Sequence, residues 1–417
     1  MAKERSSLSL RYSARSLRDG FSERGPSKSA SRPFDLRSSL LRVFGVIQRK
    51  KVVILRDNPR LCGAVLAASD TKGAMIERLL AQPAWRPSYS IESEDGARWK
   101  QLATDAKTVM ARLHWRERLP PIIARRFRDI ESKQQVRAGR LVDAELFAKL
   151  VGSIMFELVF DFPMSTEDEA LFYSASLEWR KQIAVKAEGD GRIKQAFWSR
   201  LTVLVEASEF KDGLTTYASD PAAWLSVFAQ PFLISPMINV GDIFAAAFEF
   251  LRKDAQQLER AKGWARDGDR PRIEGVLLEA IRLRHPFPIL ERELSRDLDA
   301  EGHKIAAGTH VFMTLDDFDQ DQTFDPERWL APAKENPYHA IPFAAGPRMC
   351  IGKPIALELM AQLMTGFLLS ESLDSFQPSV GHLFSGRDND GKESIAESVY
   401  QVRVFAKAMW RSMRIRS

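Results

Sequence analysis

The stretch that decides the fold is PFAAGPRMCIGKPIALELM, which runs from Pro342 to Met360. It begins as an apolar loop, carries Cys350 between Gly346 and Gly352, and continues as an amphipathic helical pattern. Glycines at these positions remove side chains where the backbone must turn tightly or approach a flat ligand. The N-terminus of the following helix favours negative charge and lowers the free energy of a thiolate at Cys350. The segment therefore predicts a loop that holds an anionic sulfur.

This loop resembles the cysteine signature of the cytochrome P450 superfamily, Phe-x-x-Gly-x-Arg-x-Cys-x-Gly. All five signature positions match: Phe343, Gly346, Arg348, Cys350 and Gly352. The resemblance implies that Cys350 is the axial thiolate ligand of a haem b iron, with Phe343 and Gly346 beside the cofactor and Arg348 paired with a haem propionate. The alternative interpretation is a buried structural cysteine in a glycine-rich turn.

Two further segments carry the resemblance upstream of the cysteine. In LLEAIRLRHPFP, Glu279 and Arg282 stand three residues apart on one helical face, the spacing at which side chains meet. Phe324–Trp329 reads FDPERW and supplies Arg328. Taken alone, a pair such as Glu279 and Arg282 is typical of a solvated surface salt bridge. The resemblance implies instead a buried network of Glu279, Arg282 and Arg328 beneath the haem, where each charge must be satisfied by the others.

Two other side chains are candidates for the haem propionates. Arg292 stands where members of the family carry a propionate-binding arginine, and Trp99, in DGARWKQLA, is similar to an indole that donates to a propionate. The alternatives are an exposed arginine at Arg292 and an aromatic core anchor at Trp99. The pattern departs at Ala103, where an arginine often follows the tryptophan, and Lys100 is the candidate substitute.

The distal helix departs furthest from the family. Monooxygenases of the superfamily usually present an acid followed by a threonine, yet residues 217–308 contain no threonine. The matching stretch is ISPMINVGDIFAAAFEFL, where Pro236 is predicted to kink the helix near its start. Asn239 and Asp242 share one helical face, so Asn239 is the candidate donor to a distal ligand and Asp242 the candidate proton relay through water. The alternative is that both residues cap the helix after Pro236.

The remaining sequence favours a mainly α protein with a small β part, the class to which the cytochrome P450 fold belongs. Helical periodicity marks residues 99–113, 141–160, 197–210, 243–251 and 273–283, while residues 51–55 and 302–313 favour strands. Residues 1–37 are rich in Ser and Arg and poor in large apolar side chains, which predicts a flexible tail. Residues 38–417 are predicted to form a single domain.

Composition limits the other classes of function. The two cysteines, Cys62 and Cys350, cannot form a disulfide framework, and no run of about 18 purely apolar residues predicts a membrane span. The net charge is +6, which suits an acidic protein partner but is also typical of a solvated basic surface, and we expect no nucleic-acid binding. These features predict a soluble, cytoplasmic protein, and the family resemblance then implies the soluble, bacterial-like P450 type. The alternative for the acid-poor tail is an organelle transit peptide.

The resemblance implies an enzyme. We expect monooxygenation of a lipophilic small molecule in secondary metabolism, with dioxygen and electrons from a ferredoxin, flavodoxin or reductase. Residues 232–244 and 287–290 are the predicted pocket walls, and they are largely apolar. The absent threonine keeps two alternatives open: a haem-thiolate enzyme that needs no redox partner, such as a dehydratase, isomerase or peroxygenase, and a haem-binding protein without turnover.

Overall fold

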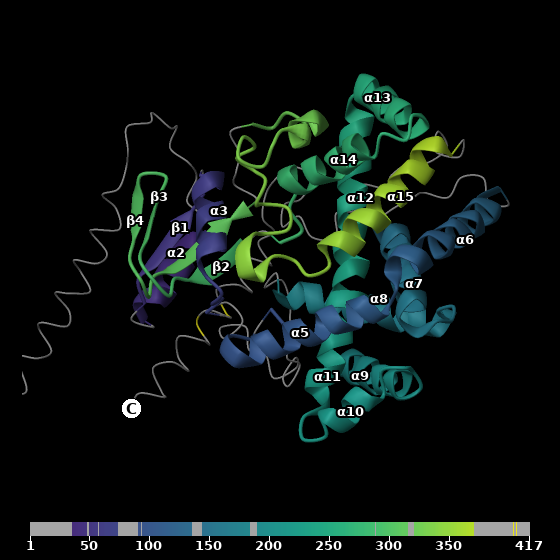
Figure 1. Ribbon diagram of the computed structural model, residues 1–417, viewed down its shortest axis with the longest axis horizontal. Helices are drawn as coiled ribbons and strands as arrows, with labels where there is room; N and C mark the ends of the chain where they lie inside the picture. The colour runs from purple at the N-terminus through teal and green to yellow at the C-terminus, as the bar shows by residue number, and fades with distance from the viewer. Residues whose placement is uncertain are drawn as a thin grey trace, which may run out of the picture.

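The structure is a computed structural model of the 417-residue chain. It describes residues 36–47, 50–56, 58–73, 91–92, 94–135, 144–183, 190–287, 289–315 and 321–370, together with Arg403 and Ala406. The predicted tail, residues 1–37, lies almost wholly outside the described residues. Helices dominate the described part, and the strands gather at one end of it (Figure 1). The predicted class, mainly α with a small β part, is confirmed.

The β part consists of a three-stranded sheet and a separate hairpin. In the sheet, β5 (His310–Thr314) is central, parallel to β1 (Val52–Leu55) and antiparallel to β2 (Ile289–Glu293). The hairpin pairs β3 (Leu298–Ala300) with β4 (His303–Ile305). Every residue of β5 is buried, as expected for a central strand. The pairing of β2 with β5 fixes the position of Arg292, which stands opposite Val311.

Two short helices flank the sheet, α2 (Leu36–Ile47) and α3 (Pro59–Ala68), as Figure 1 shows. Asn58 caps α3, and its Oδ1 accepts a hydrogen bond of 2.9 Å from the Leu61 backbone N–H. Pro59 occupies the first turn of the helix, where its missing N–H costs nothing. This helix later supports the cysteine loop.

The helical body follows from residue 96 onward. Its elements are α5 (Gly96–Arg112), α6 (Trp115–Gln135), α7 (Ala144–Phe160), α8 (Thr166–Ile183), α9 (Gly191–Glu206), α10 (Asp212–Thr216), α11 (Pro221–Phe228), the π-helical turn η1 (Ala229–Ile234), α12 (Ser235–Lys253), α13 (Ala255–Arg266), α14 (Arg270–Leu283), the 3₁₀ turns η3 (Pro326–Leu330) and η4 (Gly346–Arg348), and α15 (Lys353–Leu369). The five helices predicted from periodicity correspond to α5, α7, α9, α12 and α14.

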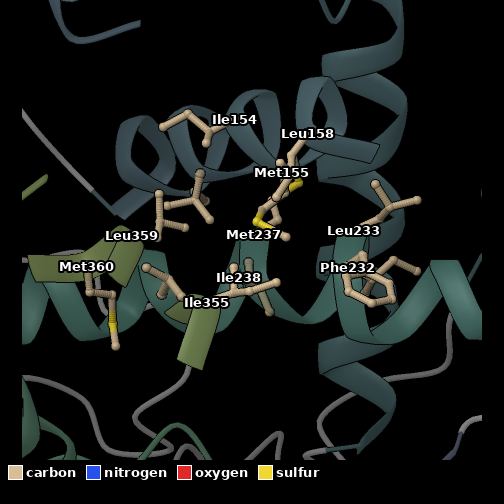
Figure 2. Packing of buried hydrophobic residues seen from close by; sticks show 14 of the residues in the cluster. Ile154, Met155, Leu158, Phe232, Leu233, Met237, Ile238, Ile355, Leu359 and Met360 are labelled. Carbon is tan, nitrogen blue, oxygen red and sulfur yellow. The ribbon is translucent and has the colours of Figure 1, made fainter. Parts of the chain in front are cut away.

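The core forms where α7, α12 and α15 converge. Figure 2 shows Ile154 of α7, Ile238 of α12 and Leu359 of α15 among the apolar side chains at this point. Two glycines allow the close crossing of α7 and α12. A Cβ at Gly241 would lie 2.9 Å from the backbone nitrogen of Ala148, and a Cβ at Gly152 would overlap the Met237 side chain. The crossing fixes α12, the helix that carries both candidate distal residues.

The chain from Pro221 to Lys253 forms one long helical segment made of α11, η1 and α12. By length and composition, with a mean hydropathy of 1.4, it could cross a membrane, but 78% of its apolar window is buried inside the protein. Core helices of globular proteins have the same composition, so the absence of a membrane span stays a prediction. Pro236 lies in the first turn of α12, directly after η1, so the predicted irregularity coincides with a π-helical turn.

Candidate functional site

The cysteine loop is held by its own backbone and by α3. The Cys350 N–H donates to the carbonyl oxygen of Phe343 at 2.8 Å, which closes the loop. Gly346 has a φ of +70°, and a Cβ there would lie 2.6 Å from the Cα of Ala67. Only glycine satisfies both the positive φ and this close approach. The glycine expected to allow a tight turn therefore does so, and it seats the loop on α3.

The Cys350 sulfur lies at the start of α15. The backbone N–H groups of Gly352 and Lys353 donate hydrogen bonds to it, as the N-terminus of a helix would. Desolvation outweighs these bonds and raises the pKa of the thiol to about 11, yet Cys350 is exposed. The Cys350 side chain is thus accessible to solvent although protein atoms lie densely around it. A Cβ at Gly352 would meet only the Cys350 Sγ, at 3.9 Å, so the glycine keeps the approach to the sulfur open.

A buried arginine faces the same region from the sheet. Arg292 is 4% exposed, and its Nη1 donates to the Glu291 carbonyl oxygen at 2.7 Å. Its Nε is buried and makes no hydrogen bond within the described residues. Burial lowers the pKa of Arg292 to about 10, and the neighbouring charge of Arg348 contributes to that shift. A buried cation with an unsatisfied donor favours an anion beside it.

Arg348 and Trp99 lie together, as two residues with one predicted role should. The Arg348 guanidinium stands 4.5 Å from the centroid of the Trp99 ring. Its Nε donates to the carbonyl oxygen of Asp70 at 2.6 Å, and its Nη2 donates to the Glu94 carbonyl oxygen and the Asp95 carboxylate. Arg348 thus ties the cysteine loop to the chain before α5. Its predicted pairing with a propionate stays a prediction, as does that of Trp99.

Glu92 interacts electrostatically with several of these groups. Its carboxylate is exposed, and its charge acts on Arg292, on Cys350 and on Arg180 of α8. The Glu92 carboxylate therefore acts electrostatically on side chains from three separate parts of the chain. A thiol at a helix N-terminus and a buried arginine with an orphan donor fit a thiolate-ligated haem with acidic side chains. Phe343, Gly346, Cys350 and Arg292 are the residues that would hold it.

The predicted network around Glu279 is confirmed. Glu279 is 0% exposed and accepts from Arg282 at 2.7 and 3.0 Å, from Arg328 Nε at 3.0 Å and from Trp329 Nε1 at 2.8 Å. Arg282 also donates to two backbone carbonyls of residues 321 and 323. A Cβ at Gly275 would lie 2.4 Å from the Pro326 carbonyl oxygen, so α14 and η3 pack with no space between them. The network joins these two elements.

Asn239 and Asp242 lie on one face of α12, as predicted. Asn239 is buried, accepts a hydrogen bond of 3.0 Å from Arg180 Nη1 and donates one of 2.7 Å to Ser235 Oγ. Asp242 is half-buried, and its charge acts on Arg180. Neither residue is a cap, because both stand inside α12. The distal roles of Asn239 and Asp242 stay predictions. The structure adds Arg180, a buried arginine that interacts with both residues and for which the sequence predicted no role.

The sequence held little signal for Arg180 or Glu92. Arg180 lies in SASLEWRKQI, where charged residues at successive positions are typical of a solvated helix, and only tertiary packing buries it. In the helix after Cys350, Glu358 accepts a hydrogen bond of 2.6 Å from Arg270 Nη1 and so joins α15 to α14. Lys100 is exposed and pairs with Asp70 at 3.8 Å, which leaves its predicted substitution untested.

Comparison with known proteins points to one family. The cytochrome P450 family model matches residues 257–385, a range that includes the Glu279 network, Arg292 and the cysteine loop. Among curated proteins, Drosophila melanogaster cytochrome P450 4d2 is 35% identical over 118 residues, which is 26% of this chain and 24% of that protein. Human mitochondrial sterol 26-hydroxylase is 29% identical over 128 residues, which is 28% of this chain and 24% of that protein. The match thus spans about a quarter of these relatives' length.

Solved structures share the fold over a much larger range. A cytochrome P450 from Thermus thermophilus, CYP175A1, aligns with a TM-score of 0.57 and 17% identity, covering 80% of this chain and 88% of that one. A zebrafish cytochrome P450 with abiraterone aligns with a TM-score of 0.55 and 19% identity, covering 75% and 84%. At these identities the similarity concerns the fold, and it extends well beyond the sequence match.

Proposed function

Since this chain belongs to the cytochrome P450 superfamily, we propose that it is a haem-thiolate monooxygenase that oxidises a lipophilic small molecule. The observation that carries the proposal is the Cys350 loop, in which the sulfur lies at the N-terminus of α15 and accepts hydrogen bonds from the backbone N–H groups of Gly352 and Lys353. When bound, haem b supplies the activation of dioxygen and the transfer of oxygen to carbon. Relatives whose printed names are monooxygenase and hydroxylase support this reaction class.

The chain's own residues divide the work around the cofactor. Cys350 would ligate the iron, and Arg292, with Arg348 and Trp99, would stabilise the propionates. The Glu279 network would keep the loop before Cys350 in register with α14. On the opposite side, the Asn239 amide donates hydrogen bonds and the Asp242 carboxylate holds and releases a proton through water. This pair would serve where the family usually places a threonine.

The substrate is proposed from the predicted pocket walls. Phe244 is 0% exposed and stacks on Phe147 at 5.2 Å in the core, so the wall predicted at residues 232–244 does not face the site at every residue. Phe287, by contrast, is half-buried beside Trp179, at 6.3 Å between ring centroids. Apolar walls of this kind select a lipophilic molecule. Secondary metabolism is the setting we propose for it, in a cytoplasmic protein of the soluble type.

An acidic electron donor is proposed from the basic surface around α15. Arg116 on α6 is exposed and acts on Glu358 of α15, the helix that begins after Cys350. Arg125 and Arg128 are exposed on the same helix. A ferredoxin or flavodoxin carries the complementary charge, which speeds association.

Turnover assays separate this proposal from its alternative. The holoenzyme would be supplied with a panel of lipophilic compounds under two regimes: dioxygen with a reductase and ferredoxin, or peroxide alone. We expect oxygenated product in the first regime, with the oxygen atom derived from labelled dioxygen. The missing threonine favours the second candidate, an enzyme without a redox partner. Product from peroxide alone, with none from dioxygen and reductant, would replace the first proposal with the second.

A further inference from the structure

Arg180 is a fully buried cation between the two predicted pocket walls. It lies near the end of α8, is 1% exposed, and has its guanidinium 4.9 Å from the centroid of the Phe287 ring. Its Nη1 reaches α12 and donates to Asn239 Oδ1 at 3.0 Å. A guanidinium rarely occupies an apolar core without a specific role, because its desolvation costs several kcal/mol, on the order of the penalty for any buried ion.

The bond from Arg180 fixes the orientation of the Asn239 amide. Arginine has donors and no acceptor, so the amide atom that faces it must be the oxygen. The Nδ2 atom then lies on the other side, where it donates to Ser235 Oγ at 2.7 Å, one helical turn earlier. An NH₂ group carries two hydrogens, and the second one remains for a ligand or water. Without Arg180, only the contact with Ser235 would remain. It would not fix the orientation of the Asn239 amide, because the Ser235 hydroxyl can accept from Nδ2 or donate to Oδ1.

The charges around Arg180 also support a role for this residue beside Asn239 and Asp242. Desolvation lowers the pKa of Arg180 to about 10, so the guanidinium stays positive at neutral pH, and the carboxylates of Asp242 and Glu92 oppose that shift. The attraction is mutual, so Arg180 favours a negative charge on Asp242. The other titratable neighbour is His285, which burial keeps neutral by lowering its pKa to about 4. Arg180 therefore acts electrostatically on the carboxylate predicted to relay protons.

We propose that Arg180 is a positioning residue for the distal face of α12: it orients the Asn239 amide through its hydrogen bond and places a positive charge near Asp242, on the helix where the family usually has a threonine. The inference rests on the proposed function, because it assigns a role within the same site. The Asn239 amide and the Asp242 carboxylate both lie on α12. The group that interacts with both of them is Arg180, which α8 supplies.

The test compares the holoenzyme with Arg180→Met, Arg180→Lys and the control Arg200→Met, in which an arginine outside the site is lost from α9. We expect Arg180→Met to lower kcat by roughly 10- to 100-fold with little change in KM, since it weakens proton delivery and not substrate binding. The acidic limb of the kcat profile should move to higher pH, because the Asp242 carboxylate loses its cation. Arg180→Lys keeps the positive charge, so the acidic side of the kcat profile should return toward its wild-type pH.

A second readout does not depend on turnover. Carbon monoxide added to the reduced protein has a stretching frequency that falls near a positive charge, so Arg180→Met should raise it and Arg180→Lys should return it toward the wild-type value. A higher KM with unchanged kcat would overturn the inference, because Arg180 would then bind substrate. Unchanged pH profiles and stretching frequencies in both variants would also overturn it. A wild-type protein that lacks a thiolate-type spectrum would instead contradict the proposed function.

Discussion

Gly346 combines two constraints in one residue. Its φ of +70° is strained for any side chain, and its Cα approaches α3 so closely that a Cβ would lie 2.6 Å from the Ala67 Cα. Gly268 has a nearly identical φ of +67°, but a Cβ there would meet nothing within 4 Å. The two glycines therefore separate the cost of the backbone conformation from the cost of the contact.

We expect Gly346→Ala to destabilise the protein by about 2 to 4 kcal/mol, and Gly268→Ala by only about 1 kcal/mol. The difference between these two losses of stability measures the overlap of the new Cβ with α3. The haem content of Gly346→Ala should also fall, because the overlap displaces the cysteine loop. Urea unfolding with the midpoint and slope fitted for each variant checks the first part. Equal losses in the two variants would show that the loop does not rest on α3.

Glu279 provides a second test at the scale of one side chain. It is 0% exposed and accepts from two arginines and an indole, so Glu279→Gln leaves buried cations without their anion. Breaking a buried network in this way costs about 3 to 5 kcal/mol. The control is Glu274→Gln, whose partner Arg270 is exposed and whose loss should cost less than about 1 kcal/mol. Thermal unfolding of the two variants at one pH distinguishes them, and similar midpoints would contradict the account.

Among the elements, α8 and α9 are joined by one ion pair whose strength depends on pH. Asp168 is 5% exposed and accepts from Arg200 Nε at 2.7 Å and from Nη2 at 2.8 Å. The hydrogen bonds from Arg200 hold the pKa of Asp168 below its ordinary value, against the opposing effect of burial. A carboxyl with a lowered folded-state pKa contributes stability at pH above its unfolded value, near 3.9, and loses it as the pH falls through the folded value.

We therefore expect Asp168→Asn to lose about 1 to 3 kcal/mol at pH 7 and to unfold with a shallower acid dependence below about pH 4 than the wild type. Asp299→Asn is the control, because Asp299 pairs with Lys304 at 3.6 Å on an exposed hairpin. Unfolding free energies measured from pH 7 to pH 3 check both statements. A constant difference between wild type and Asp168→Asn at every pH would contradict the assigned cause.

The elements also show what the sequence could predict. The helices α5, α7 and α14 follow from apolar periodicity, and the role of the cysteine loop follows in part from its glycines and the helix after it. The Glu279 network was predictable only through the family resemblance, because the spacing of Glu279 and Arg282 alone is typical of a surface salt bridge. The π-helical turn before Pro236 could not be predicted from the sequence, because α11, η1 and α12 form one segment whose irregularity depends on packing. Arg180 was also missed, since no local pattern distinguishes an arginine that tertiary packing buries from one on a solvated helix.

For the whole molecule, the charges that matter for an acidic electron donor are the exposed arginines of α6, such as Arg116, which acts on Glu358 of α15. We expect Arg116→Glu to slow reduction by an acidic ferredoxin roughly 10-fold at low salt, because it reverses a charge near the helix that follows Cys350. Arg192→Glu, a change of an exposed arginine on α9, should leave the rate unchanged. Stopped-flow reduction between low and high ionic strength checks this, since the difference should shrink as salt screens it. Equal rates for both variants would place the partner elsewhere.

The central claim is that Cys350 is the thiolate ligand of haem, and the carbon monoxide difference spectrum of the reduced protein tests it most directly. Wild type would be compared with Cys350→Ser and with Cys62→Ala, which changes a buried thiol of α3 whose pKa is raised by burial. If Cys350 ligates the iron, we expect a far red-shifted, thiolate-type Soret band in wild type and in Cys62→Ala, and the loss of this band in Cys350→Ser. The same band in all three proteins, or no haem bound by the wild type, would contradict it.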